Sequence, residues 1–145
     1  MVINYPSNLW LSDVGGSIPS DAGQRRRISG GPLLDLKALQ EIIASGQLSV
    51  DNIWPATRRC RNSLEDYRWS FDTVLEIFSC LLPEDYKNSE WCGVDGNRTV
   101  PCDVYRVCFD DVRRKRNPNA CEVYLKFSID DAGALTLVLV QSHFS

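Results

Sequence analysis

The chain lacks long apolar runs and an excess of basic charge. No run approaches the roughly 18 apolar residues of a membrane span, and no basic region followed by an apolar core opens the sequence. We therefore expect a protein of the cytoplasm that makes no membrane contact. Lys and Arg total 16 against 19 Asp and Glu, a formal charge of −3. This mild acidity argues against indiscriminate binding to nucleic acids.

Metal-binding spacing is also missing, although the chain has six cysteines. No Cys-x-x-Cys pair occurs and the only histidine is His143, so a tetrahedral zinc site would need scattered ligands. We expect no metal and no cofactor. Cys92 and Cys102 flank a Gly-Val-Asp-Gly-Asn turn and could form one disulfide, but a reducing compartment favours free thiols.

The chain does contain enough apolar material for one core. Its 145 residues are 43% hydrophobic and 10% aromatic, which fits a single small domain. Residues 1–32 mix Gly, Ser, Pro, Asn and Arg without a sustained period, so we predict an irregular N-terminal arm. The domain itself is predicted to span residues 33–145.

Helical patterns occupy the first half of this domain. Apolar residues recur at helical spacing over residues 33–46, where a glycine suits the C-terminal cap. Asp51 is predicted to cap a second short helix over residues 51–60. A third helix is predicted over residues 72–81, and a further helical turn over residues 83–87.

Strand patterns occupy the second half. We predict strands over about residues 103–109, 121–129 and 134–141. In the second strand every other residue is apolar, so Tyr124 and Lys126 are expected to share one solvent-exposed face. The last strand is apolar on both faces and is predicted to be central and doubly covered. Helices followed by strands indicate an α+β domain whose N-terminal helices pack on a largely antiparallel sheet.

Basic residues gather in three clusters despite the net negative charge. The longest covers residues 113–116 and begins with Arg113 and Arg114; the others lie at residues 25–27 and 58–61. Each cluster could bind phosphate groups. A solvated loop, or local salt bridges to the two aspartates that precede the longest cluster, would account for the same pattern.

Five short motifs follow one another along the domain in a recognisable order and spacing. They are Ser45-Gly46-Gln47, Phe71-Asp72, Asp85-Tyr86-Lys87, Asp103-Val104-Tyr105-Arg106 and Val123-Tyr124-Leu125-Lys126, ahead of a final apolar strand. This series resembles the MqsR family of toxins over about residues 33–142. The resemblance implies a RelE-like fold and an endoribonuclease toxin of a toxin–antitoxin system. Such a toxin cuts mRNA without a metal and is held inactive by an antitoxin encoded beside it.

The resemblance also assigns roles to single residues. Lys87 and Tyr124 match the catalytic lysine and tyrosine of the family. Cys102 stands where the family has a glutamine, and Gln141 stands about where it has a lysine near the end of the last strand. His143 lies two residues further on and carries the side chain best suited to proton transfer near neutral pH. We therefore hypothesise that His143 substitutes for the absent lysine.

Metal-free RNA cleavage sets clear chemical demands on these residues. The 2′-hydroxyl is the nucleophile, so the protein must accept one proton, donate another to the leaving 5′-oxygen and stabilise negative charge on phosphorus. Lys87 and Lys126 suit charge stabilisation, and Tyr124 suits proton transfer or a hydrogen bond to phosphate. The predicted RNA-binding residues are Arg106, whose planar fork matches a phosphate, together with Lys126, Cys102, Arg113 and Arg114.

Other functions remain open on the sequence alone. A protein that kept the fold but lost catalysis would bind RNA or a protein partner, which would explain the missing glutamine and lysine. A thiol-dependent enzyme would use Cys102 and would need a lowered thiol pKa and a nearby base, for which the chain offers His143. Ordinary exposure on a strand would also account for Tyr124 and Lys126.

Overall fold

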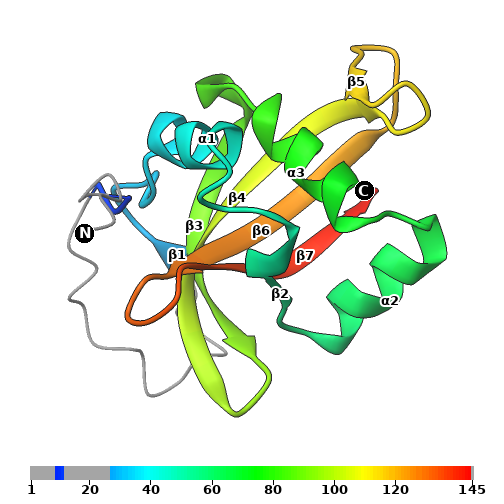
Figure 1. The fold of residues 1–145 in the computed structure, drawn as a ribbon. Coiled ribbons are helices and arrows are strands. Elements are labelled where there is room, and N and C mark those ends of the chain that lie inside the picture. The colour runs from blue at the N-terminus through cyan, green and yellow to red at the C-terminus, as the bar shows by residue number, and fades with distance from the viewer. Residues whose placement is uncertain (1–8, 12–26, 145) are drawn as a thin grey trace.

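A sheet covered on one face by helices forms the domain (Figure 1). The computed structural model describes residues 9–11 and 27–144, and within them three α-helices accompany a mostly antiparallel sheet of seven strands. The predicted α+β class is confirmed. Most of the predicted arm, including Arg25 and Arg26, lies outside the described residues. None of the helices described is long and apolar enough to cross a membrane.

Two of the helices form where the apolar spacing predicts them. α1 (Leu36–Ala44) begins after Asp35, whose carboxylate accepts a hydrogen bond from the Ala38 N–H, and α3 (Phe71–Ser79) begins after the capping Ser70. Both lie on the same side of the sheet in Figure 1. Their apolar faces enter the main core, where the ring of Phe78 meets that of Phe127 edge-on at 4.6 Å.

The prediction of a helix over residues 51–60 is wrong. A short 3-10 turn, η1 (Val50–Asn52), is followed by strand β2 (Ile53–Pro55), and the helix α2 (Arg58–Tyr67) begins only after the capping Thr57. The proline at the end of β2 disfavours helical geometry in the residue before it, so the chain stays extended until that point is passed.

The sheet contains one long strand that the sequence does not predict. After a 3-10 turn, η2 (Pro83–Asp85), strand β3 (Tyr86–Val94) pairs antiparallel with β4 (Arg98–Asp110). The turn predicted over residues 83–87 therefore ends early, and Lys87 lies in β3. Asn, Ser, Glu and Gly within β3 have weak strand propensity, so its pairing with β4 stabilises it more than its composition does.

The remaining strands complete the order β1-β3-β4-β6-β7-β2, with β5 paired to β4. They are β1 (Arg27–Ile28), β5 (Lys115–Arg116), β6 (Glu122–Asp130) and β7 (Thr136–Phe144). β7 is buried on both faces, as predicted, but it is not central, because it lies beside the edge strand β2 with which it pairs in parallel. The centre of the sheet is formed by β4 and β6.

The two faces of the sheet differ in what covers them. One face packs against α1 and α3 and carries the buried side chains Tyr105, Val107, Leu125, Phe127 and Leu139. The opposite face, here called the open face, carries the alternate residues of β4 and β6. One end of the open face is closed where the β3–β4 turn reaches the loop after β2, with the Asp95 N–H donating to the Ala56 carbonyl at 2.9 Å. A small apolar cluster fills that end: Ala56, Val94, Val100, Val138 and Val140, with Trp54 against it.

A buried carboxylate fastens the segment before α1 to the sheet. Asp103 of β4 is 0% exposed and accepts hydrogen bonds from the N–H groups of Leu33 and Leu34, each at 2.9 Å. The Ser89 hydroxyl of β3 donates to the same carboxylate at 2.6 Å. Burial raises the pKa of Asp103, and the three hydrogen bonds oppose that rise. This side chain therefore joins the N-terminal segment, β3 and β4.

Parts of the N-terminal segment lie against the domain. Leu9 is buried, and Trp10 forms an antiparallel bridge with Leu34. β1 pairs with β3, and between β1 and α1 the chain passes so close to the sheet that a Cβ on Gly31 would lie 1.9 Å from the Tyr86 hydroxyl. Residues that the motif series leaves out thus extend the sheet by one strand.

Replacing Asp103 by Asn tests the carboxylate clamp. The amide nitrogen cannot accept a hydrogen bond, so at least one of the three donors loses its acceptor. A hydrogen bond to a charged group contributes about 1.5–3 kcal/mol, and we expect the free energy of unfolding in urea to fall by about 2 kcal/mol. Asp131→Asn, in an exposed turn, should change it by less than about 0.5 kcal/mol. Equal stability of the two variants would contradict the clamp.

Candidate functional site

Five of the predicted site residues lie together on the open face. Arg106 of β4 is the cross-strand partner of Tyr124 of β6, which is in turn the partner of His143 of β7. In the next row, Lys126 of β6 is the partner of Gln141. Directly paired residues project to the same side of a sheet. Side chains from three strands therefore meet around Tyr124.

The ring of Tyr124 is the centre of this group. The imidazole of His143 stacks on it with 5.2 Å between ring centroids and an interplanar angle of 16°. The guanidinium carbon of Arg106 lies 5.3 Å from the ring centroid, and the Lys126 ammonium lies 5.7 Å from it. Two cations and an imidazole thus surround one half-buried phenol. Negative charge that develops on or beside this phenol would be stabilised by both cations.

Lys126 is not exposed to solvent, which corrects the expectation for its face. Its side chain is 10% exposed and forms an ion pair with Glu90 of β3. Burial lowers the pKa of Lys126, but the contacts of its ammonium, led by the hydrogen bond to Glu90, outweigh this effect, so the pKa is raised overall. The ammonium therefore stays charged. The sequence could not predict this burial because Glu90 belongs to the strand that it does not indicate.

Lys87 lies at an irregular point of the β3–β4 ladder. The pairing shifts between Tyr86 and Asn88, which leaves Lys87 without a partner residue in β4. Such a bulge re-aims a side chain. Lys87 is exposed and, with Arg106, lines a cavity of about 440 Å³. The other walls of the cavity come from η2, β4, the segment around β5 and the start of β6: Asp85, Val107, Cys108, Arg116, Asn117, Pro118 and Glu122.

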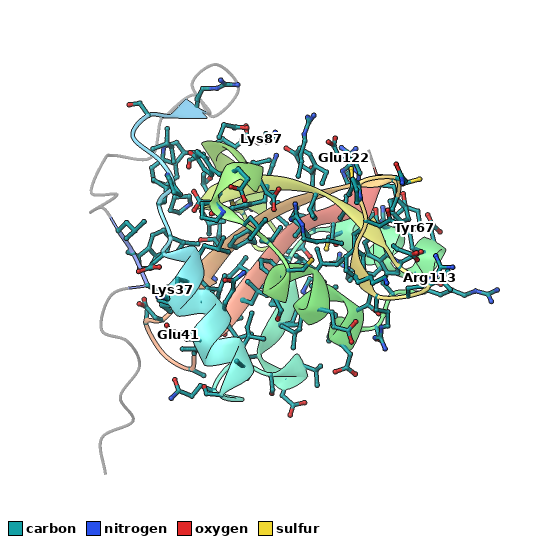
Figure 2. The ribbon with its side chains drawn as sticks, turned by 90° about the horizontal axis from the view of Figure 1, so that it is seen from above. Lys37, Glu41, Tyr67, Lys87, Arg113 and Glu122 are labelled. Atoms are coloured by element: carbon teal, nitrogen blue, oxygen red, sulfur yellow. The ribbon has the colours of Figure 1, made fainter. Side chains whose placement is uncertain are left out.

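Figure 2 shows where this cavity lies relative to the helices. Lys87 and Glu122 are on the side of the sheet away from α1, whose Lys37 and Glu41 point in the opposite direction. The Lys87 and Glu122 walls of the cavity therefore lie on the open face, although Val107 of the helix-covered face also contributes to the lining. Because Arg106 both lines the cavity and contacts the Tyr124 ring, the cavity and the Tyr124 group form one continuous site.

One ring nitrogen of His143 contacts a backbone carbonyl and the other is buried. Nδ1 lies 2.9 Å from the carbonyl oxygen of Phe144, and Nε2 is buried with no hydrogen-bond partner among the residues that the structure describes. If Nδ1 carries the proton and donates it to that carbonyl, Nε2 remains as an acceptor that a substrate cannot reach. This geometry favours stacking on Tyr124 over the proton-transfer role hypothesised for His143.

Three predicted RNA contacts do not join the site. Arg114 binds α3, with Nε 3.0 Å from Glu76 and Nη2 2.9 Å from the Thr73 hydroxyl, and α3 covers the opposite face of the sheet. Arg113 lies in the exposed loop after β4 and pairs with Asp110 at 3.3 Å. Cys102 is on the open face but is 0% exposed beneath the closed end, so it cannot touch RNA in this structure.

The same burial speaks against thiol chemistry. It raises the pKa of Cys102, and the neighbouring Cys92 adds to the rise, whereas a nucleophilic thiol needs a lowered pKa. Cys92 and Cys102 lie on neighbouring strands and are not joined by a disulfide. Within the described residues, no group of three or more His, Cys, Asp or Glu side chains could hold a metal ion.

Two carboxylates in the site are not among the residues predicted from the sequence. Glu122 lines the cavity, and its Oε1 lies 3.7 Å from Arg106. It precedes Tyr124 by two residues, so the same alternation that places Tyr124 on the open face could have identified it. Glu90 has no comparable signal, because nothing in the composition of β3 marks it as a strand. The site therefore contains cations, a phenol and, in Glu122, a carboxylate that could accept a proton.

No family model, no curated protein and no solved structure matches the chain.

Two substitutions of His143 test the stacking role. His143→Phe keeps a flat ring on Tyr124 and removes the buried, unpartnered nitrogen, so the free energy of unfolding should be unchanged or higher. His143→Ala removes the stacked ring and should lower it by about 1–2 kcal/mol. Urea denaturation of the three proteins measures this. Equal destabilisation by Phe and Ala would show that a ring nitrogen, and not the stack, holds His143 in place.

Proposed function

We propose that the protein is a metal-independent endoribonuclease that cuts single-stranded mRNA. We further propose that it is the toxin of a toxin–antitoxin system, with a RelE-like fold, and that an antitoxin encoded beside it neutralises it. One observation carries the proposal. Three motifs that are separate in the sequence supply Lys87, Arg106, Tyr124 and Lys126 to one continuous site on the open face.

The charges of the site suit a phosphodiester. Lys87 and Arg106 line the cavity from adjacent strands and can hold the non-bridging oxygens of one phosphate. Lys87 forms no ion pair with any described residue, so its ammonium is available for this contact. As negative charge grows on phosphorus in the transition state, both cations stabilise it.

Proton transfer can be assigned to two side chains of the same site. In the proposed step Glu122 accepts the proton of the 2′-hydroxyl, and the 2′-oxygen forms a bond to phosphorus. The bond from phosphorus to the 5′-oxygen breaks, and the leaving oxygen takes the proton of the Tyr124 hydroxyl. The products are a 2′,3′-cyclic phosphate and a free 5′-hydroxyl. Arg106 and Lys126, both beside the Tyr124 ring, stabilise the phenolate until water transfers the proton from Glu122 back to Tyr124.

A second candidate function rests on the departures from the motif pattern. Cys102 is buried where the family has glutamine, and Gln141 stands about where the family has lysine. A protein with these changes could bind RNA or a protein partner through the same face without cutting RNA. Binding of RNA without cleavage would favour this reading.

Cleavage of a defined mRNA in EDTA tests the main proposal. Wild type should cut at specific sites and leave 2′,3′-cyclic phosphate ends. Lys87→Ala and Tyr124→Phe should each lower the rate by about 10²-fold or more, the range that positioned proton transfer and charge stabilisation contribute. Lys37→Ala, on the far side of the sheet in Figure 2, is the matched control and should cut normally. A folded wild type that does not cut, or variants that cut equally well, would refute the nuclease.

Glu122→Gln tests the assignment of the proton acceptor separately. The amide cannot take the proton, so kcat should fall by about 10²-fold. Binding of an oligonucleotide with 2′-O-methyl groups, which cannot react, should stay the same or become tighter, because a negative charge is removed from the cavity. If kcat stays at the wild-type value while Lys87→Ala abolishes cleavage, another group accepts the proton.

A further inference from the structure

The strand β1 adds a cation to the open face from outside the motif series. Arg27 is the antiparallel partner of Glu90 of β3, and Ile28 is the partner of Ser89. Glu90 projects to the open face, where it pairs with Lys126. Because directly opposed residues share a face, Arg27 lies on the open face as well. Figure 1 shows β1 beside β3 at the edge of the sheet.

The position of Arg27 is fixed by contacts that neighbouring residues of the N-terminal segment make with the sheet. The Asp103 carboxylate binds the N–H groups of Leu33 and Leu34, and Gly31 passes in close contact with the Tyr86 hydroxyl. These contacts lie a few residues after β1 and fix the path of the chain across β3. The Arg27 side chain itself is exposed and forms no ion pair with the residues described.

The cations of the open face that have no carboxylate partner lie in β1, β3 and β5. Three other cations of this face have carboxylate partners: Lys126 with Glu90, Arg106 with Glu122 and Arg98 with Asp130. Among the described residues of this face, Lys87, Arg27 and Lys115 are cations without such a partner; Lys115 opposes Asp110 in the β4–β5 pair without forming an ion pair. An anionic polymer that enters the cavity at Lys87 is therefore attracted further along the β1–β3 side of the sheet.

We propose that Arg27 is a phosphate-binding residue that holds the RNA substrate outside the cavity. The inference rests on the proposed nuclease function and extends its binding surface onto β1. Arg27 is three strand spacings of about 4.8 Å and about four residues of about 3.3 Å from Tyr124, roughly 20 Å in all. It therefore grips a phosphate well away from the bond that is cut. Such a contact strengthens binding of substrate and transition state equally, so it lowers KM and leaves kcat unchanged.

Binding and cleavage by Arg27→Gln test this role. Affinity for a single-stranded oligonucleotide with 2′-O-methyl groups is measured by fluorescence anisotropy between about 50 and 200 mM salt. Arg27→Gln should bind about 3- to 10-fold more weakly, and the slope of log K against log salt should become shallower by about 0.7, the value for one phosphate contact on a single strand. Arg27→Lys keeps the charge and should keep the slope. Lys37→Gln is the charge-matched control on the other side of the sheet and should change neither.

On a cleavable RNA, Arg27→Gln should raise KM by the same factor at unchanged kcat. If wild type cuts RNA and Arg27→Gln matches its affinity, salt slope and KM, the phosphate contact is refuted while the nuclease stands. If Arg27→Gln and Arg27→Lys weaken binding equally with an unchanged slope, Arg27 acts by shaping β1 and the inference is also refuted. If wild type neither binds nor cuts RNA, the proposed function fails and this inference fails with it.

Discussion

The buried carboxylate of Asp103 is the interaction on which the arrangement of the site depends. A charge that is 0% exposed must be hydrogen-bonded, and Asp103 meets this requirement with donors from the N-terminal segment and from β3. Because side chains alternate along a strand, turning Asp103 to the helical side turns Arg106, three residues later in β4, to the open face. The same interaction keeps β3 on β4, and β3 supplies both Lys87 and Glu90.

The site itself combines a protected cation with accessible ones. The side chain of Lys126 is 10% exposed and forms an ion pair with Glu90. Removing two charges from water costs so much free energy that apolar side chains of similar volume often stabilise a fold as well as a buried ion pair does. The position of Lys126 beside the Tyr124 ring suggests that it serves the phenol rather than the substrate directly. Lys87 at the bulge and Arg106 above the ring are the cations that a phosphate can reach. If Lys126 stabilises the phenol while Lys87 and Arg106 bind phosphate, a chain of net charge −3 can bind RNA at this one site without attracting it over the whole surface.

Much of the candidate site could be predicted from local sequence, and the misses have physical causes. The alternation of apolar and polar residues in β6 correctly places Tyr124 and Lys126 on one face. The same alternation places Glu122 on that face, although the sequence analysis does not name it as a site residue. The burial of Lys126 could not be predicted, since its partner Glu90 lies 36 positions earlier in a strand of poor propensity. Arg113 and Arg114 form a basic cluster in the sequence, but the β4–β5 turn directs Arg114 to α3. Clusters of charge in a sequence do not reveal which side of a sheet they will face.

Local sequence patterns predict the elements with strong periodicity: α1 and α3, the later strands, the α+β class and the alternation that brings Tyr124 to one face. These depend on residues within a few positions of one another, so local patterns contain them. Long-range packing is what makes β3 a strand, adds β1 to the sheet, covers Cys102 and buries Nε2 of His143. Each of these depends on hydrogen bonds or packing between segments far apart in the chain, and no local pattern records such pairings.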